Sequence, residues 1–135
     1  MRARPPTLPR SCSPGLAALT LLLAASLACQ TLRPMSAQEQ FIQGTWGWGQ
    51  DFGDGHGSYL TWTFAAGSFT VEGYPPLHQT GRYAVSDSTN DTLTLALTDQ
   101  SGDWGTADRA VIVVIDEAAG SLTIENNGPY NRVTP

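Results

Sequence analysis

Alternating apolar and polar residues dominate the chain after residue 40 and restrict what it can fold into. The stretch YLTWTF places Leu60, Trp62 and Phe64 on one side of an extended chain and hydroxyl-bearing residues on the other. The same period of two recurs in SFTVE, TLTLAL and SLTIE. Alternation of this kind, rich in aromatic and β-branched residues, is typical of strands with one buried face. We therefore expect residues 41–135 to form one all-β domain.

Turn residues separate these runs at short intervals. AAGS occurs twice, and Gly67 and Gly120 within it can adopt positive φ in tight hairpins. The predicted strands lie near residues 43–49, 58–65, 68–74, 80–86, 91–98, 108–116, 120–126 and 129–134. Sequential strands with short connections pair as antiparallel neighbours, and closure removes exposed edges, so we expect an up-and-down eight-stranded barrel.

The predicted interior is crowded with large side chains. Those expected to point inward are Trp46, Trp48, Leu60, Trp62, Phe64, Phe69, Val71, Tyr83, Val85, Leu93, Leu95, Leu97, Val113, Ile115, Leu122, Ile124 and Tyr130. Because protein interiors pack at a density of about 0.75, short strands with this content leave room for a shallow site at one end rather than a deep cavity. The segment RAVIVVID, residues 109–116, is apolar on both faces, which predicts a central position or a covered outer face.

The first 28 residues have the features of an export signal. Arg2, Arg4 and Arg10 precede an apolar or small run from Gly15 to Ala28. This run is shorter than the roughly 20 residues that a membrane-spanning helix needs. We therefore expect a signal helix over residues 1–28 that is removed on export.

The segment ASLAC resembles the lipobox of bacterial lipoproteins, with Ser26 where leucine is usual. The resemblance implies cleavage after Ala28, a diacylglyceryl group on the Cys29 sulfur and acylation of the new amino terminus. Each buried methylene adds about 0.8 kcal/mol of membrane affinity, so two or three chains make a stable anchor. Residues 29–40 then form a short lipidated tether. Cys12 lies in the removed segment, so no disulfide is expected.

The charge balance argues against nucleic acid as a partner. The chain carries 7 basic residues, all arginine, against 12 acidic ones. Without Arg2, Arg4 and Arg10 the balance of charge is strongly acidic, so the domain has too few basic residues to form a surface that binds phosphate backbones. Anionic lipid headgroups would also repel such a domain, so we expect lipid alone to hold it at the membrane.

Several motifs carry a second resemblance. The first predicted strand begins with Gly44-Thr-Trp46, PYNRV supplies Arg132 on the last strand, and Gly81 and Tyr83 form a G-x-Y motif. These features resemble the small lipocalin-like (calycin) domains of bacterial lipoproteins over residues 41–134. The resemblance implies that Arg132 packs over Trp46 near the closed end of the barrel, a contact of about 0.5–2 kcal/mol.

Trp48, Trp62 and Trp104 are the candidate ligand-binding residues. Buried tryptophans often serve the core alone, which is the alternative for Trp46 and Trp62. Trp104 differs because it lies in the polar loop SGDWG. A tryptophan in such a loop either folds back as a lid over apolar surface or contacts a ligand directly.

Metal and catalytic signatures fail on their spacing. Asp51, Asp54 and His56 gather in DFGDGHG, but counting twelve positions from Asp51 reaches Trp62 instead of the glutamate of a calcium loop. His56 and His78 lack the spacing of a zinc site. No nucleophile elbow or phosphate loop occurs. We expect no metal, no cofactor and no enzyme activity.

Two function classes fit these features. One is a membrane-anchored extracytoplasmic lipoprotein whose barrel binds a small apolar or aromatic ligand. The other is a structural or inhibitory envelope protein that docks on a protein partner through its loops and acidic surface. Gln30 stands where an aspartate would signal inner-membrane retention, which favours the outer membrane in a cell with two membranes.

Overall fold

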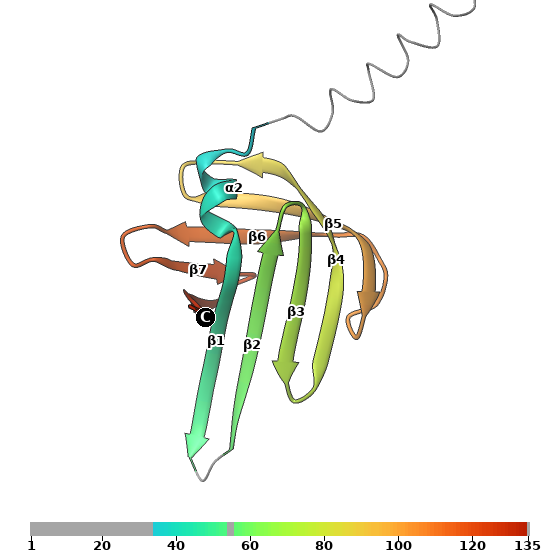
Figure 1. Cartoon of the computed structure of the whole chain (residues 1–135), viewed down its shortest axis with the longest axis vertical. Helices are drawn as coiled ribbons and strands as arrows, with labels where there is room; N and C mark the ends of the chain where they lie inside the picture. The colour runs from blue at the N-terminus through green and yellow to red at the C-terminus, as the bar shows by residue number, and fades with distance from the viewer. Residues whose placement is uncertain (1–33, 54–55, 135) are drawn as a thin grey trace, which may run out of the picture. The chain divides into compact units, whose positions relative to one another are not determined.

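The computed structural model describes residues 34–53 and 56–134, and within these it is nearly all β. The elements are α2 (Ala37–Ile42), β1 (Gly44–Gly53), β2 (His56–Ala65), β3 (Ser68–Tyr74), β4 (Leu77–Ser88), β5 (Thr92–Gly102), β6 (Arg109–Asp116), β7 (Ser121–Ile124) and β8 (Asn127–Arg132) (Figure 1). The expected signal helix, Cys29 and most of the tether lie outside the described residues. No helix among the residues described is long and apolar enough to cross a bilayer.

The strands form a closed antiparallel barrel in the order β1 to β8, which confirms the predicted fold. Each strand pairs with its neighbour in sequence, and β1 pairs with β8 to close the ring through Trp46 opposite Arg132 and Gly47 opposite Asn131. The Val133 N–H also donates to the Thr45 carbonyl at 2.9 Å. Each described strand pairs with a neighbour on both sides, although β8 meets β1 only at these two residue pairs.

A short helix precedes β1 where the sequence predicted an irregular tether. Ser36 caps α2 by accepting from the Glu39 N–H at 3.1 Å, and the Glu39 carboxylate accepts from the Ser36 N–H at 2.8 Å. This reciprocal capping box satisfies two donors that a helix start otherwise leaves free. The compact unit that contains the barrel begins at Met35, so the last residues of the predicted tether belong to it, and residues 37–40 are helical.

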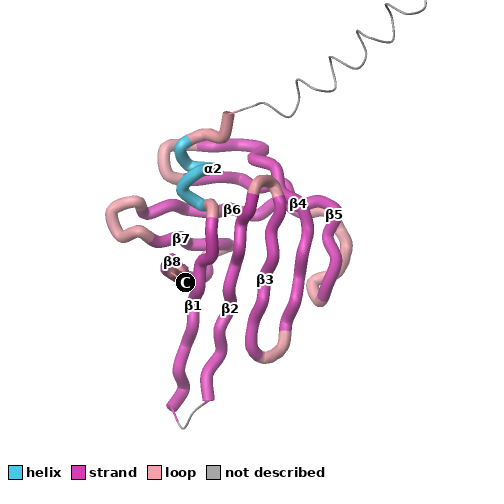
Figure 2. The backbone as a smooth tube through the Cα atoms, viewed as in Figure 1, coloured by secondary structure: helices cyan, strands magenta, loops and turns pink. Residues whose placement is uncertain are grey.

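The two ends of the barrel differ, and we name them by what covers them. At the helix end, α2 lies beside the β2–β3 and β4–β5 turns, where the Gln43 carboxamide accepts from the Ala66 N–H at 2.9 Å and the Gln38 carboxamide donates to the Thr89 carbonyl at 3.0 Å. At the loop end lie the β3–β4 turn and the β5–β6 loop (residues 103–108) (Figure 2).

The interior follows the predicted alternation. Every side chain of the predicted inward set is buried or packs half-buried against the core, and Ile42 from α2 and Val111 from β6 join it. The expectation of a covered outer face for residues 109–116 is not met. Ile112 and Val114 on this face are 54% and 40% exposed. The other alternative, a central position, holds to the extent that β6 pairs with β5 on one side and β7 on the other.

Four strands, β1, β2, β4 and β5, extend further toward the loop end than predicted. β4 begins at Leu77 and β5 continues to Gly102, beyond the predicted residues 80 and 98. The added pairs include Gln79 opposite Gly102. A side chain on Gly102 would collide with the His78 carbonyl oxygen, so only glycine lets β5 approach β4 here.

Candidate ligand site at the loop end of the barrel

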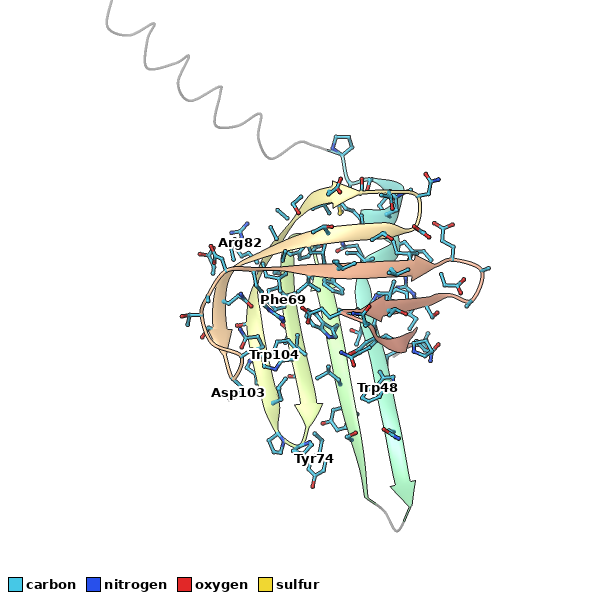
Figure 3. All side chains as sticks on the ribbon, turned by 180° about the vertical axis from the view of Figure 1, so that it is seen from behind. Trp48, Phe69, Tyr74, Arg82, Asp103 and Trp104 are labelled. Atoms are coloured by element: carbon cyan, nitrogen blue, oxygen red, sulfur yellow. The ribbon has the colours of Figure 1, made fainter. Side chains whose placement is uncertain are left out.

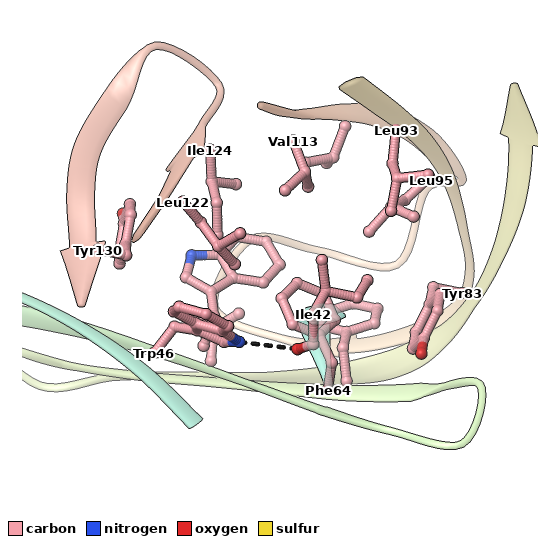
Figure 4. Close-up of a cluster of buried hydrophobic side chains, with 14 of the residues drawn as sticks. Ile42, Trp46, Phe64, Tyr83, Leu93, Leu95, Val113, Leu122, Ile124 and Tyr130 are labelled. Carbon is pink, nitrogen blue, oxygen red and sulfur yellow. Dashed lines mark hydrogen bonds between the residues drawn. The ribbon is translucent and has the colours of Figure 1, made fainter. Parts of the chain in front are cut away.

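The helix end is sealed by its own side chains. The Trp46 indole N–H donates to the Ile42 carbonyl at 2.7 Å (Figure 4). The Arg132 guanidinium lies 4.3 Å from the centroid of the Trp46 ring and donates to the Phe41 and Gln43 carbonyls at 2.7 and 2.8 Å. These are carbonyls at the end of α2, which a cation stabilises. The expected placement of Arg132 over Trp46 is therefore what the structure has, and the arginine joins the last strand to the end of α2.

An aromatic cluster surrounds Trp62, the cross-strand partner of Trp46, and only its outer member, Trp104, comes from the loop end. The Trp62 ring lies 5.6 Å from Trp104, 5.7 Å from Phe64 and 5.8 Å from Phe69, measured between centroids. Trp62 is 1% exposed, whereas Trp104 is 38% exposed and covers it from the solvent side. Figure 3 shows Trp48 and Trp104 nearer to the loop end than Phe69. Trp104 thus has the position of a lid over Trp62.

A buried glutamine holds Trp104 in this position. Gln79 is fully buried, and its carboxamide oxygen accepts from the Trp104 N–H at 3.0 Å while its NH2 group donates to the Gly105 carbonyl at 2.9 Å. The Asp103 carboxylate accepts from the His78 N–H at 2.7 Å on the outer side of the same loop. These three hydrogen bonds position the backbone of the loop and so place Trp104 over Trp62.

A second glutamine anchors the far side of the loop. Gln100 is 6% exposed, and its NH2 group donates to the Ala107 carbonyl. Its inward direction depends on Asp99, which has a φ of 50° and lies at an irregularity in the β4–β5 register. Such a bulge shifts the alternation by one residue. The Asp99 carboxylate therefore stays at the surface, and Gln100 takes the inward position.

Arg109 packs on the solvent side of Trp104. Its guanidinium carbon lies 5.0 Å from the centroid of the Trp104 ring, and its NH1 group donates to both carboxylate oxygens of Glu125 at 3.0 and 3.1 Å. The Arg109 Nε is buried and has no hydrogen-bond partner among the described residues. The cation–π contact and the ion pair hold the arginine beside the lid, with one donor unused.

The second unused donor is at the centre of the cluster. The Trp62 Nε1 is buried and lacks an acceptor within the part of the chain that the structure describes. The Tyr130 hydroxyl is nearby. Burial raises the pKa of this phenol, a weak hydrogen-bond interaction with the Trp62 indole N–H lowers it, and the Glu125 carboxylate raises it. The Trp62 N–H and the Tyr130 hydroxyl do not reach the geometry of a full hydrogen bond. Trp48 packs on Tyr130 with centroids 6.4 Å apart.

The three predicted tryptophans thus end up in one region. Trp62 and Trp104 are in direct contact, whereas Trp48 reaches the cluster through Tyr130. The sequence did not single out Gln79 or Arg109 as members of this region. Alternation continued backward from Tyr83 would have placed Gln79 inside, because the two are four residues apart on one strand.

Metal ligands do not converge in the described residues, where no group of three or more His, Cys, Asp or Glu side chains could hold an ion.

Comparison with known proteins adds no relative. No protein-family model matches the chain, and neither the curated proteins nor the solved structures searched contain a match.

Proposed function

We propose that this protein is a lipid-anchored extracytoplasmic lipoprotein whose lipocalin-like barrel binds a small planar aromatic ligand at its loop end. The observation that carries the binding proposal is the Trp62 indole N–H, which is buried in an aromatic cluster and has no acceptor within the described residues. Small-molecule sites are mostly apolar and contain a few placed polar groups that orient the ligand.

The energetics favour a ligand that carries a hydrogen-bond acceptor. A buried donor without a partner destabilises the folded protein by about 1–3 kcal/mol. A carbonyl or similar oxygen that reached Trp62 Nε1 would recover this, while the rings of Trp48, Trp62 and Trp104 offer stacking surfaces. Entry requires displacement of Trp104, which is partly exposed and contacts Trp62 from outside.

The binding proposal is tested with residues 30–135, because Met35–Pro135 form one compact unit that contains the complete barrel. Two matched probes are 2-acetylnaphthalene and 2-ethylnaphthalene, which differ in one carbonyl oxygen, with tryptophan quenching as the readout. We expect the ketone to bind about 5–10-fold more tightly, as one hydrogen bond of about 1 kcal/mol predicts.

Trp62→Phe is the decisive variant, since it keeps an aromatic ring and removes the N–H. It should abolish the preference for the ketone while both probes still bind. If neither probe quenches the wild-type tryptophans at any concentration, the binding proposal fails, and the alternative of docking on an envelope protein is favoured.

The anchor is a separate proposal. It is supported by the sequence ASLAC and by the basic and apolar segments before it. Mass spectrometry of the intact protein from cells should show a chain that begins at Cys29 and carries two or three acyl chains. An unmodified Cys29 would contradict the anchor without bearing on the ligand site.

A further inference from the structure

A groove with a different chemistry lies on the outer surface of the barrel near the β3–β4 turn. It has a volume of about 480 Å³, and its walls include the side chains of Tyr59, Glu72, His78 and Asp103. Tyr59 is 53% exposed, and the Glu72 and His78 side chains are 65% and 60% exposed. None of these side chains belongs to the aromatic cluster around Trp62.

An exposed pair of stacked tyrosines forms one side of this region. Tyr59 and Tyr74 are directly opposite each other on β2 and β3, with ring centroids 6.4 Å apart and planes inclined by 17°. Tyr74 is 54% exposed. Both stacked rings are more than half exposed, so aromatic surface remains accessible beside the groove that Tyr59 lines.

The charges around the groove have one sign. Glu72 and Asp103 contribute carboxylates, and neither lysine nor arginine is among the lining residues. The His78 Nδ1 lies 3.8 Å from a carboxylate oxygen of Glu72. The surrounding field reinforces this, because four of the seven basic residues precede Met35 while all twelve acidic residues follow it. A cation is therefore attracted to the groove, and an anion is repelled.

We propose that this groove binds an organic cation of the trimethylammonium type. The face of a tyrosine attracts such a cation through its quadrupole when the charge lies within about 6 Å of the ring centroid. Recognition of quaternary ammonium groups by aromatic rings is a general use of this interaction. Glu72, on the strand next to Tyr59, supplies the compensating charge. A bulky, weakly hydrated cation suits an exposed groove of this size better than a metal ion, which would need several oxygen ligands.

The test is a titration of residues 30–135 with choline chloride, followed by NMR of the tyrosine rings. The neutral analogue 3,3-dimethyl-1-butanol has the same shape and serves as the control ligand. We expect saturable shifts confined to Tyr59, Tyr74 and their neighbours, an affinity that falls as salt rises, and at least fivefold weaker binding of the neutral analogue.

Variants sharpen the result. Tyr59→Leu should weaken choline binding about 3–5-fold, and Glu72→Gln should weaken it about 2–5-fold, as one exposed cation–π contact or ion pair of about 0.5–1 kcal/mol predicts. Glu117→Gln, an exposed carboxylate in the β6–β7 turn, should change nothing. Equal binding of choline and its neutral analogue, shifts that respond instead to N-acetylglucosamine, or an unaffected Tyr59→Leu variant would each overturn the proposal. Trp62→Phe should leave choline binding intact, so this test is independent of the ligand site inside the barrel.

Discussion

The helix end and the loop end of the barrel use the same residue types in opposite ways. At the helix end, the Trp46 N–H and the Arg132 guanidinium both donate to backbone carbonyls of the segment around α2. Toward the loop end, Arg109 lies over Trp104, which packs on Trp62, the cross-strand partner of Trp46. Here the Trp62 Nε1 and the Arg109 Nε have no partner within the described residues.

This difference separates a structural tryptophan–arginine pair from a candidate site. Buried donors are almost always satisfied in folded proteins, and an exception calls for a reason. In the part of the helix end that the structure describes there is no such donor, which is consistent with a purely structural role. The loop end has two within one cluster, beneath a lid that two glutamines hold in place.

The largest expected effect is at the helix end. Trp46→Ala removes a fully buried indole, and we expect it to lower the free energy of unfolding by about 3–5 kcal/mol because the cavity cannot collapse beneath the rigid barrel. Urea denaturation followed by circular dichroism measures this. A loss below about 1 kcal/mol would show that Trp46 at the helix end does not have the structural role assigned to it.

Arg132→Gln should have the next largest effect. The change removes two charge-assisted hydrogen bonds to α2 and the contact with Trp46, so we expect a loss of about 2–3 kcal/mol in the same assay. Arg82→Gln is the matched control, since the exposed Arg82 side chain makes no hydrogen bond, ion pair or ring contact within the described residues, and it should stay within about 0.5 kcal/mol of the wild type. Similar losses in both variants would assign the effect to net charge instead of to barrel closure.

At the loop end, Gln79→Leu should cost about 1–2 kcal/mol and free the lid. The substitution leaves the Trp104 N–H and the Gly105 carbonyl without their buried partner, and the loop can then turn toward water. Acrylamide quenching of tryptophan fluorescence should increase relative to Thr98→Ala, an exposed control on β5. Unchanged quenching would mean that the ring contact with Trp62 alone holds Trp104.

The smallest effect near neutral pH is expected for Tyr130→Phe, and it becomes visible only in alkali. Burial raises the pKa of Tyr130 above the ordinary value of 10.0. Below pH 10 both the folded and the unfolded protein keep the proton, so this group adds no pH dependence. Above it, the unfolded phenol ionises first, and the free energy of unfolding falls by up to about 1.4 kcal/mol per pH unit. Tyr130→Phe should flatten this alkaline decline. An identical decline in both proteins would place the cause at another residue.

The barrel was predictable because its signal is local. A period of two fixes which face of each strand is buried, and turn residues fix the connections, so strand order and interior followed from residues such as Leu93, Leu95 and Leu97. The capping box of α2 was equally readable, since Ser36 and Glu39 have the spacing of that motif. The prediction of an irregular tether overlooked it.

The support of the candidate site was less accessible. Gln79 lies in phase with Tyr83, but a glutamine beside a Pro-Pro turn suggests a loop instead of a buried wall position. Gln100 points inward only because the bulge at Asp99 changes the phase, and nothing in a strand pattern signals a non-glycine residue with positive φ. The contact of Arg109 with Trp104 depends on how the loop closes, which spacing does not encode.

The pairing of β1 with β8 also sets the order in which the chain can be completed. Every other strand pair joins neighbours in sequence and can form as soon as a hairpin leaves the ribosome, whereas Trp46 must wait for Arg132. Until Asn127–Arg132 arrive, the first strand has a bare edge able to recruit foreign strands. A nascent chain cut short before residue 127 should therefore aggregate or be degraded instead of persisting as a smaller barrel. Survival of the folded domain thus depends on synthesis of the last strand.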